Sequence, residues 1–160
     1  MGIPALSRLM SSAAFILALA IGLLAWPLPA PAADPLVIQR ETRSKSFDDV
    51  VFELEFAITQ RNFRISARND IARGIRARGV ENVPNALIIH FCNLAFAREA
   101  LEIDPLLLTY MPCRVAVYEH RDRVVVSTMR LPADADDPRA NAFARKINGM
   151  LHQIIDFAVQ

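Results

Sequence analysis

The stretch MPCRVAVYEHRDRVVVSTMRL, residues 111–131, holds two apolar runs separated by a short polar turn. The runs, residues 111–119 and 123–131, are rich in valine, and β-branched side chains favour extended strands. The turn over residues 120–122 is short enough to return the chain directly beside itself. The sequence therefore predicts an antiparallel hairpin.

Three further segments are predicted to be strands. Residues 36–43 and 63–68 alternate apolar and polar side chains, which is typical of half-buried strands. Residues 86–91 are apolar throughout except for His90, a pattern typical of a strand that is covered on both faces. Together with the hairpin, these segments predict about five strands.

A helix is predicted to begin after Ser46, a preferred N-cap residue, and to run to about residue 61. Its apolar residues recur at helical spacing, and Phe52 and Phe56 are expected to widen the apolar face. Three more helices are expected, over residues 71–78, 94–103 and 138–158. The last two follow Asn93 and Asp137 as predicted N-caps.

The order of these elements predicts an α+β fold, because strands and helices do not alternate strictly. Residues 34–160 are expected to form a single domain of ordinary size. Removing Arg8 from the 18 Lys and Arg leaves 17, equal to the 17 Asp and Glu, so the domain is formally neutral. A nucleic-acid partner is therefore not expected.

Residues 1–33 are predicted to be a secretory signal peptide. Arg8 precedes the mostly apolar stretch 10–26, and prolines then interrupt the chain before small residues at 30–33. The apolar stretch is close to the shortest length that spans a bilayer, so an uncleaved membrane anchor is the alternative. Either reading places the domain outside the cytoplasm, in the periplasm or secreted.

Catalytic signatures are missing from the sequence. Residues 34–160 contain only Gly74, Gly79 and Gly149, too few for a dinucleotide fingerprint or a phosphate-binding loop. No nucleophile and base can be paired by their spacing. The sequence therefore names no catalytic residue and no cofactor, and leaves open whether the chain is an enzyme.

The two cysteines, Cys92 and Cys113, lie at the ends of two predicted strands. They are interpreted as a disulfide, as two buried free thiols, or as a functional pair in a redox or metal site. His90 lies two residues before Cys92 and hence on the same strand face. His90, Cys92 and Cys113 are therefore a candidate ligand set for copper, zinc or haem iron.

Arginines are concentrated in residues 61–78, which contain six of them and a single acid, Asp70. Arg64 and Arg68 are expected to share a strand face, where their guanidinium groups would bind an anionic ligand or a lipid headgroup. The alternative is that they are solvated or pair with acids elsewhere, and the acids nearby in the sequence are Glu41, Asp48, Asp49, Glu53 and Glu55.

Several short motifs resemble the domain of unknown function 302 family over about residues 46–131. They are Phe91-Cys92-Asn93, Asp104-Pro105, Pro112-Cys113-Arg114-Val115, Val117-Tyr118-Glu119 and Val124-Val125-Val126. The resemblance implies a compact α+β fold, with an antiparallel sheet and helices packed on one side, often in exported proteins. It also implies that Cys92 and Cys113 belong to one site, and it implies no biochemical activity.

The leading hypothesis is an exported binding or accessory domain that holds a small apolar or anionic ligand, with Cys92 and Cys113 at the rim of its pocket. The alternative is a redox or metal-binding protein that uses both cysteines with His90. The partner is expected to be a small molecule or a periplasmic protein. A role within a membrane-associated complex is a third hypothesis, and it requires that residues 1–33 be retained.

Overall fold

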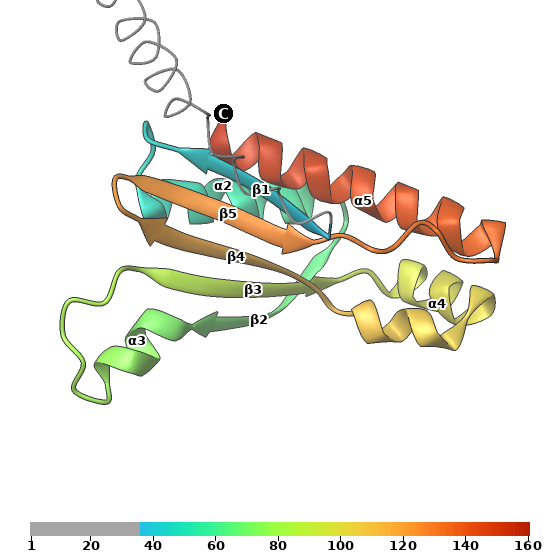
Figure 1. The fold of residues 1–160 in the computed structure, drawn as a ribbon, viewed down its shortest axis with the longest axis horizontal. Helices are drawn as coiled ribbons and strands as arrows, with labels where there is room; N and C mark the ends of the chain where they lie inside the picture. Colours follow the sequence, from blue (N-terminus) through green and yellow to red (C-terminus); the bar gives the residue numbers. More distant parts are fainter. Residues whose placement is uncertain (1–35) are drawn as a thin grey trace, which may run out of the picture. The chain divides into compact units, whose positions relative to one another are not determined.

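A five-stranded sheet in the order β1-β5-β4-β3-β2 forms the centre of the described structure, and all neighbouring strands are antiparallel (Figure 1). The computed structural model describes residues 36–160, so the predicted signal peptide lies outside the described residues. The strands are β1 (Val37–Thr42), β2 (Arg64–Asp70), β3 (Ala86–Cys92), β4 (Cys113–His120) and β5 (Arg123–Met129). The predicted hairpin is confirmed, because His120 pairs with Arg123 across the turn between β4 and β5.

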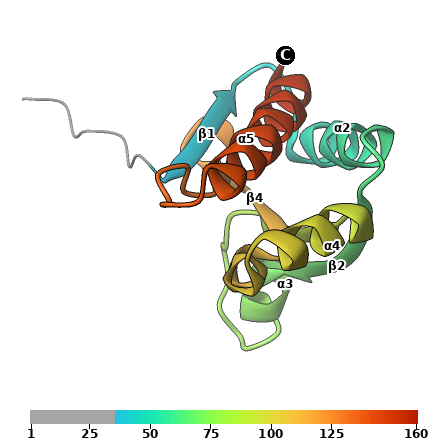
Figure 2. The same ribbon diagram turned by 90° about the vertical axis from the view of Figure 1, so that its right-hand side faces the viewer.

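Two helices, α2 (Phe47–Gln60) and α5 (Pro138–Val159), cover one face of the sheet (Figure 2). Both begin at the predicted N-caps: the side chain of Ser46 accepts a hydrogen bond from the Asp49 amide, and that of Asp137 accepts one from the Arg139 amide. These bonds satisfy amide groups that have no partner within the helix. The predicted α+β class, with helices on one side of an antiparallel sheet, is confirmed.

Three shorter helices lie in the connections between strands: α3 (Ile71–Arg76), α4 (Leu94–Ile103) and the 3₁₀ helix η2 (Pro105–Tyr110). Asn93 caps α4 as predicted, since its Oδ1 accepts hydrogen bonds from the Ala95 and Phe96 amides. The pattern of residues 105–110 does not predict η2. The side chain of Asp104 accepts a hydrogen bond from the Leu106 amide, so the residues that end α4 also start the next helical segment.

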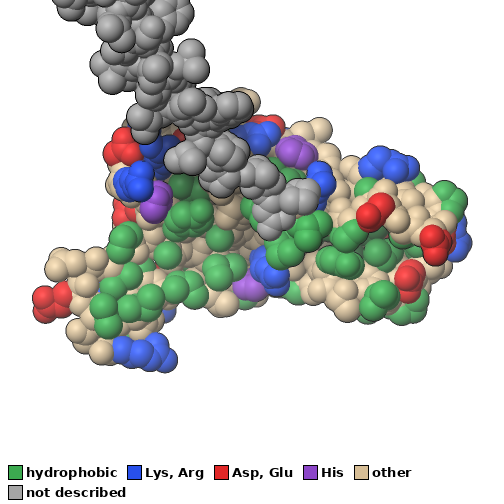
Figure 3. All heavy atoms as spheres, in the orientation of Figure 1, with side chains coloured by type: hydrophobic (Ala, Val, Ile, Leu, Met, Phe, Trp, Pro, Cys, Tyr) green, Lys and Arg blue, Asp and Glu red, His purple; other side chains and the backbone are tan. Residues whose placement is uncertain are grey.

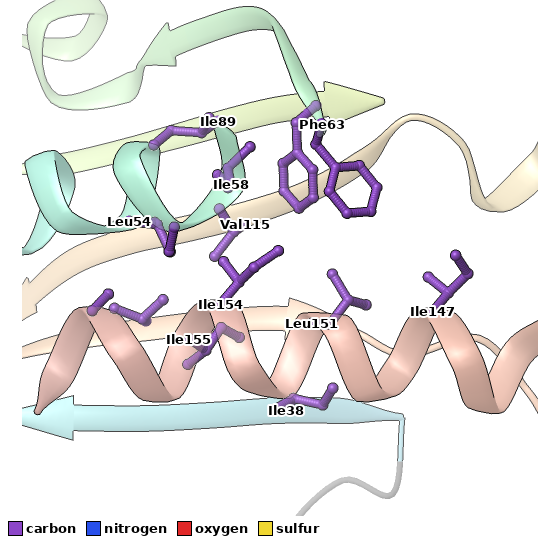
Figure 4. Close-up of a cluster of buried hydrophobic side chains, with 14 of the residues drawn as sticks. Ile38, Leu54, Ile58, Phe63, Ile89, Val115, Ile147, Leu151, Ile154 and Ile155 are labelled. Atoms are coloured by element: carbon purple, nitrogen blue, oxygen red, sulfur yellow. The ribbon is translucent and has the colours of Figure 1, made fainter. Parts of the chain in front are cut away.

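The hydrophobic core lies between the two long helices and the sheet (Figure 4). From α2 and α5, Leu54 and Leu151 are at most 2 % exposed, and from the sheet Ile89 and Val115 are equally buried. Such burial is the main favourable contribution to folding. At the end of the sheet, the ring of Phe63 packs edge-on against Phe91, with 5.3 Å between ring centroids.

Phe52 and Phe56 do not join this core. They are 73 % and 47 % exposed, so the prediction that they widen the buried face of α2 is wrong. Both lie on the side of α2 away from the buried Val50, Leu54 and Ile58. A helix in a two-layer arrangement buries only the stripe that faces the sheet and its neighbouring helix.

No helix in residues 36–160 covers the opposite face of the sheet, which we call the open face (Figures 1 and 2). Figure 3 views the molecule from this side and shows hydrophobic side chains spread across the strands. The expectation that β3 is covered on both faces is therefore met on one face only within the described residues. Alternation and pairing assign to the open face the side chains of Val37, Ala86, Ile88, His90, Arg114, Ala116, Tyr118, Ser127 and Met129.

None of the helices described in this part of the chain is both long enough and apolar enough to cross a membrane. The contacts within the chain group Asp34–Gln160 into one compact unit.

Replacing Leu54, which is fully buried on α2, with alanine is expected to lower the free energy of unfolding by about 2–5 kcal/mol, because it leaves a cavity in the core. The matched control is Leu94→Ala on α4, where the side chain is 82 % exposed and the expected change is within about 0.5 kcal/mol. Urea unfolding followed by circular dichroism measures both. Equal losses would contradict the assignment of the buried face of α2.

Candidate functional site

The pairing of β3 with β4 determines where the two cysteines lie. Phe91 lies opposite Cys113, so both side chains point to the core side, and Cys113 packs against the hydrophobic core. Cys92, one residue further, lies opposite Arg64 and points to the open face. Both cysteines are free thiols in the structure, and their Cβ atoms point to opposite faces. A disulfide between them would require the strand ends to move.

The thiol of Cys113 is protonated at neutral pH. Burial raises its pKa to about 11, and the nearby Cys92 contributes to the rise. Since the thiolate is the form that attacks electrophiles and binds metals, this environment disfavours both reactions. Among residues 36–160, no three His, Cys, Asp or Glu side chains lie close enough together to hold a metal ion. His90 and Cys92 share the open face as predicted, but Cys113 does not join them.

Arg64 and Arg68 do not share a strand face, so this prediction is wrong. A β-bulge between Ile65 and Ala67 adds one residue to β2 and reverses the alternation beyond it. Arg64 consequently lies on the open face, whereas Arg68 lies on the core side. There Arg68 binds Glu55 of α2 through two nitrogens, with 2.7 Å between Nη2 and Oε2. The charge of Arg68 is therefore already neutralised.

A cavity of about 260 Å³ lies at the end of the sheet, where η2 leads into β4. We call it the sheet-end cavity. Three open-face side chains from three strands, His90, Arg114 and Met129, contribute to its lining. The remaining lining residues come from η2 and from the ends of β4 and β5: Thr109, Tyr110, Met111, Pro112, Cys113, Arg130 and Leu131.

The charge of the sheet-end cavity is positive, since its lining contains two arginines and no acidic residue. Within residues 36–160, neither Arg114 nor Arg130 forms a salt bridge; Arg114 Nη2 instead contacts Met129 Sδ at 3.5 Å. Guanidinium groups bind carboxylates and phosphates through paired hydrogen bonds. The lining of the cavity therefore combines two arginines that have no salt bridge within residues 36–160 with apolar and thioether side chains.

A larger cavity, of about 590 Å³, lies near the turn between β4 and β5 and has a different charge arrangement. Its lining includes Arg43 and Arg123, but both form salt bridges with Asp122, at 2.9 and 3.4 Å. Arg123 also binds Glu41 at 2.6 Å. Arg121 also lines this cavity and forms no salt bridge within residues 36–160, but the lining contains the acidic Glu119 and Asp122. The geometry therefore favours the sheet-end cavity, whose lining contains no acidic residue, as the candidate site for an anion.

The sheet-end cavity adjoins a depression of about 170 Å³ on the open face. The two hollows share Arg114 and Met129. The other residues that line the depression are Val37, Ile88, Ala116, Ser127 and Thr128. We call this depression the trough.

Sequence reasoning singled out His90 and Cys113 but missed Arg114 and Arg130. One signal was present: Arg114 interrupts an apolar strand, where a charge needs a specific reason. Arg130 lies at the far end of the following strand, and the antiparallel pairing of β4 with β5 brings it to the same end of the sheet.

With Cys92 replaced by serine, Cys113 is the only thiol, and its alkylation tests the raised pKa. The rate of its reaction with iodoacetamide is expected to be low at pH 8 and to increase until about pH 11, because only the thiolate reacts. Mass spectrometry at a series of pH values measures this rate. A rate that levels off near pH 8.5, the ordinary cysteine pKa, would contradict the buried environment of Cys113.

Comparison with known proteins agrees with this architecture. A structure described as the uncharacterized conserved protein DUF302 from Bacillus stearothermophilus superposes with a TM-score of 0.70 and 18 % identity, covering 79 % of this chain and 100 % of that one. At that identity the likeness shows the fold alone. A search of curated proteins finds no match. The model of the family described as domain of unknown function DUF302 matches residues 38–158. The match extends beyond the motifs of residues 46–131 and includes β1 and α5. The chain is therefore a member of the DUF302 family.

Proposed function

We propose that this chain is an exported binding domain that holds a small anionic molecule in the sheet-end cavity. The observation that carries the proposal is that two arginines, Arg114 and Arg130, and no acidic residue line the cavity. Concave sites with apolar walls and a few polar groups are the usual form of small-molecule sites.

The positive charge of the cavity lining supports the proposal. Some arginines elsewhere on the domain, such as Arg64, form no salt bridge within residues 36–160, whereas others pair with acids: Arg40 with Asp156 at 2.7 Å, and Arg68 with Glu55. The two guanidinium groups of the cavity have no such partner within residues 36–160, so the carboxylate or phosphate of a ligand would supply the opposite charge. Hydrogen bonds to charged groups contribute roughly 1.5–3 kcal/mol each, and less where water reaches them.

A redox or metal-binding role for His90, Cys92 and Cys113 has less support. The side chains lie on both faces of the sheet, and the raised pKa of Cys113 keeps its thiol protonated at neutral pH. The binding role uses the same end of the sheet without requiring either thiol to react.

Replacing Arg114 with methionine removes the charge and keeps an unbranched side chain. The dissociation constant for butanoate is expected to increase about five- to ten-fold, because one charge-assisted hydrogen bond is lost. Titration followed by ¹H–¹⁵N NMR measures the affinity. The matched control is Arg64→Met, on the same face but outside the cavity lining, which should leave the affinity unchanged. Equal weakening by both substitutions, or no binding of butanoate to the unmodified protein, would contradict the proposal.

The position at which the mature chain begins, measured on protein isolated from cells, tests whether the protein is exported. We expect the mature chain to begin at Ala33 or Asp34, after the small residues that follow the prolines. Cell fractionation followed by intact-mass measurement locates the terminus. A chain that keeps residues 1–33 and sediments with membranes would support the anchor instead, whereas a full-length chain in the cytoplasm would contradict export.

A further inference from the structure

We infer that the ligand is an amphipathic anion, a carboxylate with an unbranched hydrocarbon tail. Its carboxylate would bind Arg114 and Arg130 in the sheet-end cavity, and its tail would lie in the trough on the open face. This inference rests on the proposed function, because the head group occupies the same anion site.

The two hollows meet at shared residues. Arg114 and Met129 line both the cavity and the trough, and Arg114 Nη2 lies 3.5 Å from Met129 Sδ. A molecule whose head group contacts the guanidinium of Arg114 therefore has the trough beside it. The polar end and the apolar surface lie next to each other, as an amphipathic ligand requires.

The trough results from small side chains in the middle of the sheet. Ile88, Ala116 and Ser127 are successive cross-strand neighbours on β3, β4 and β5, and the positions on β4 and β5 carry the small residues. Side chains of neighbouring strands stand about 5 Å apart, so small residues beside a larger one leave a hollow above the backbone. Apart from Arg114, no charged residue lines the trough.

The composition of this surface favours a hydrocarbon tail over water. The uncovered face of an antiparallel sheet normally carries polar side chains in alternation with the core. Here the trough is lined by Val37, Ile88, Ala116 and Met129, with only the two hydroxyl residues besides Arg114. An unbranched tail lying along this floor would remove apolar surface from water on both sides, and a compact anion such as phosphate would leave it exposed.

A chain-length series tests this inference on the full chain as isolated. We expect the dissociation constant to fall about two- to four-fold for each added methylene from butanoate through hexanoate to octanoate; the upper value corresponds to complete burial of a methylene. Titration calorimetry below the micelle-forming concentration measures the series. Equal affinities for all three acids would overturn the inference and leave the anion site intact. A failure of all three to bind would overturn the proposed function as well.

A substitution that fills the trough tests binding of the hydrocarbon tail separately from binding of the carboxylate. Ala116→Val keeps a good strand former and adds two methyl groups at the trough floor. It is expected to weaken octanoate binding at least about five-fold while changing butanoate binding less than about two-fold, because several buried methylenes are displaced but the guanidinium groups remain. The control is Ala67→Val. Ala67 also lies on the open face, but it belongs to β2 and does not line the trough. An equal loss of octanoate affinity in both variants, or an unchanged affinity in Ala116→Val, would overturn the inference.

Discussion

The register between β3 and β4, in which Phe91 lies opposite Cys113, is the constraint on which the rest of the structure depends. A slip of one residue would exchange the two faces of β3, placing His90 in the core and Phe91 in water. The fully buried Ile89 and Phe91 make that exchange very costly. The same register separates Cys92 from Cys113 and directs His90 and Arg114 to the open face. The positions of all the candidate site residues on these two strands therefore follow from hydrophobic burial.

The arrangement in two layers determines where a ligand has room to bind. α2 and α5 pack their buried side chains against one face of the sheet and form the hydrophobic core with it. The open face has no such cover within residues 36–160, and the sheet-end cavity and the trough both lie along it. Some apolar residues there, such as Met129 at 47 % exposure, gain little from folding alone, since they stay partly in water. Contact with an apolar molecule is a physical reason for such residues to be on a face that no helix covers.

The sequence predicts the local features of this fold well and the long-range features poorly. Ser46, Asn93 and Asp137 are confirmed as N-caps because a cap depends on a few neighbouring residues. The hairpin is confirmed for the same reason. The bulge in β2 is different, because it depends on how that strand pairs with β3. The exposure of Phe52 likewise depends on what covers α2, and neither feature has a signal in the local pattern of residues.

The residues of the candidate site are also poorly predicted from the sequence, because they come together only through long-range pairing. Sequence reasoning gave weight to the cysteines because they are rare, but burial leaves the Cys113 thiol protonated. Arg114 and Arg130 are 16 positions apart and reach one cavity only through the hairpin. Neither arginine has an acidic partner within residues 36–160, although residues 34–160 contain as many acidic as basic residues. Other arginines, such as Arg40, Arg68 and Arg123, do form salt bridges. Arg114 and Arg130 are both exposed, so water solvates their guanidinium groups when no ligand is bound. In the proposed complex, the carboxylate of the ligand would replace part of this water through charge-assisted hydrogen bonds.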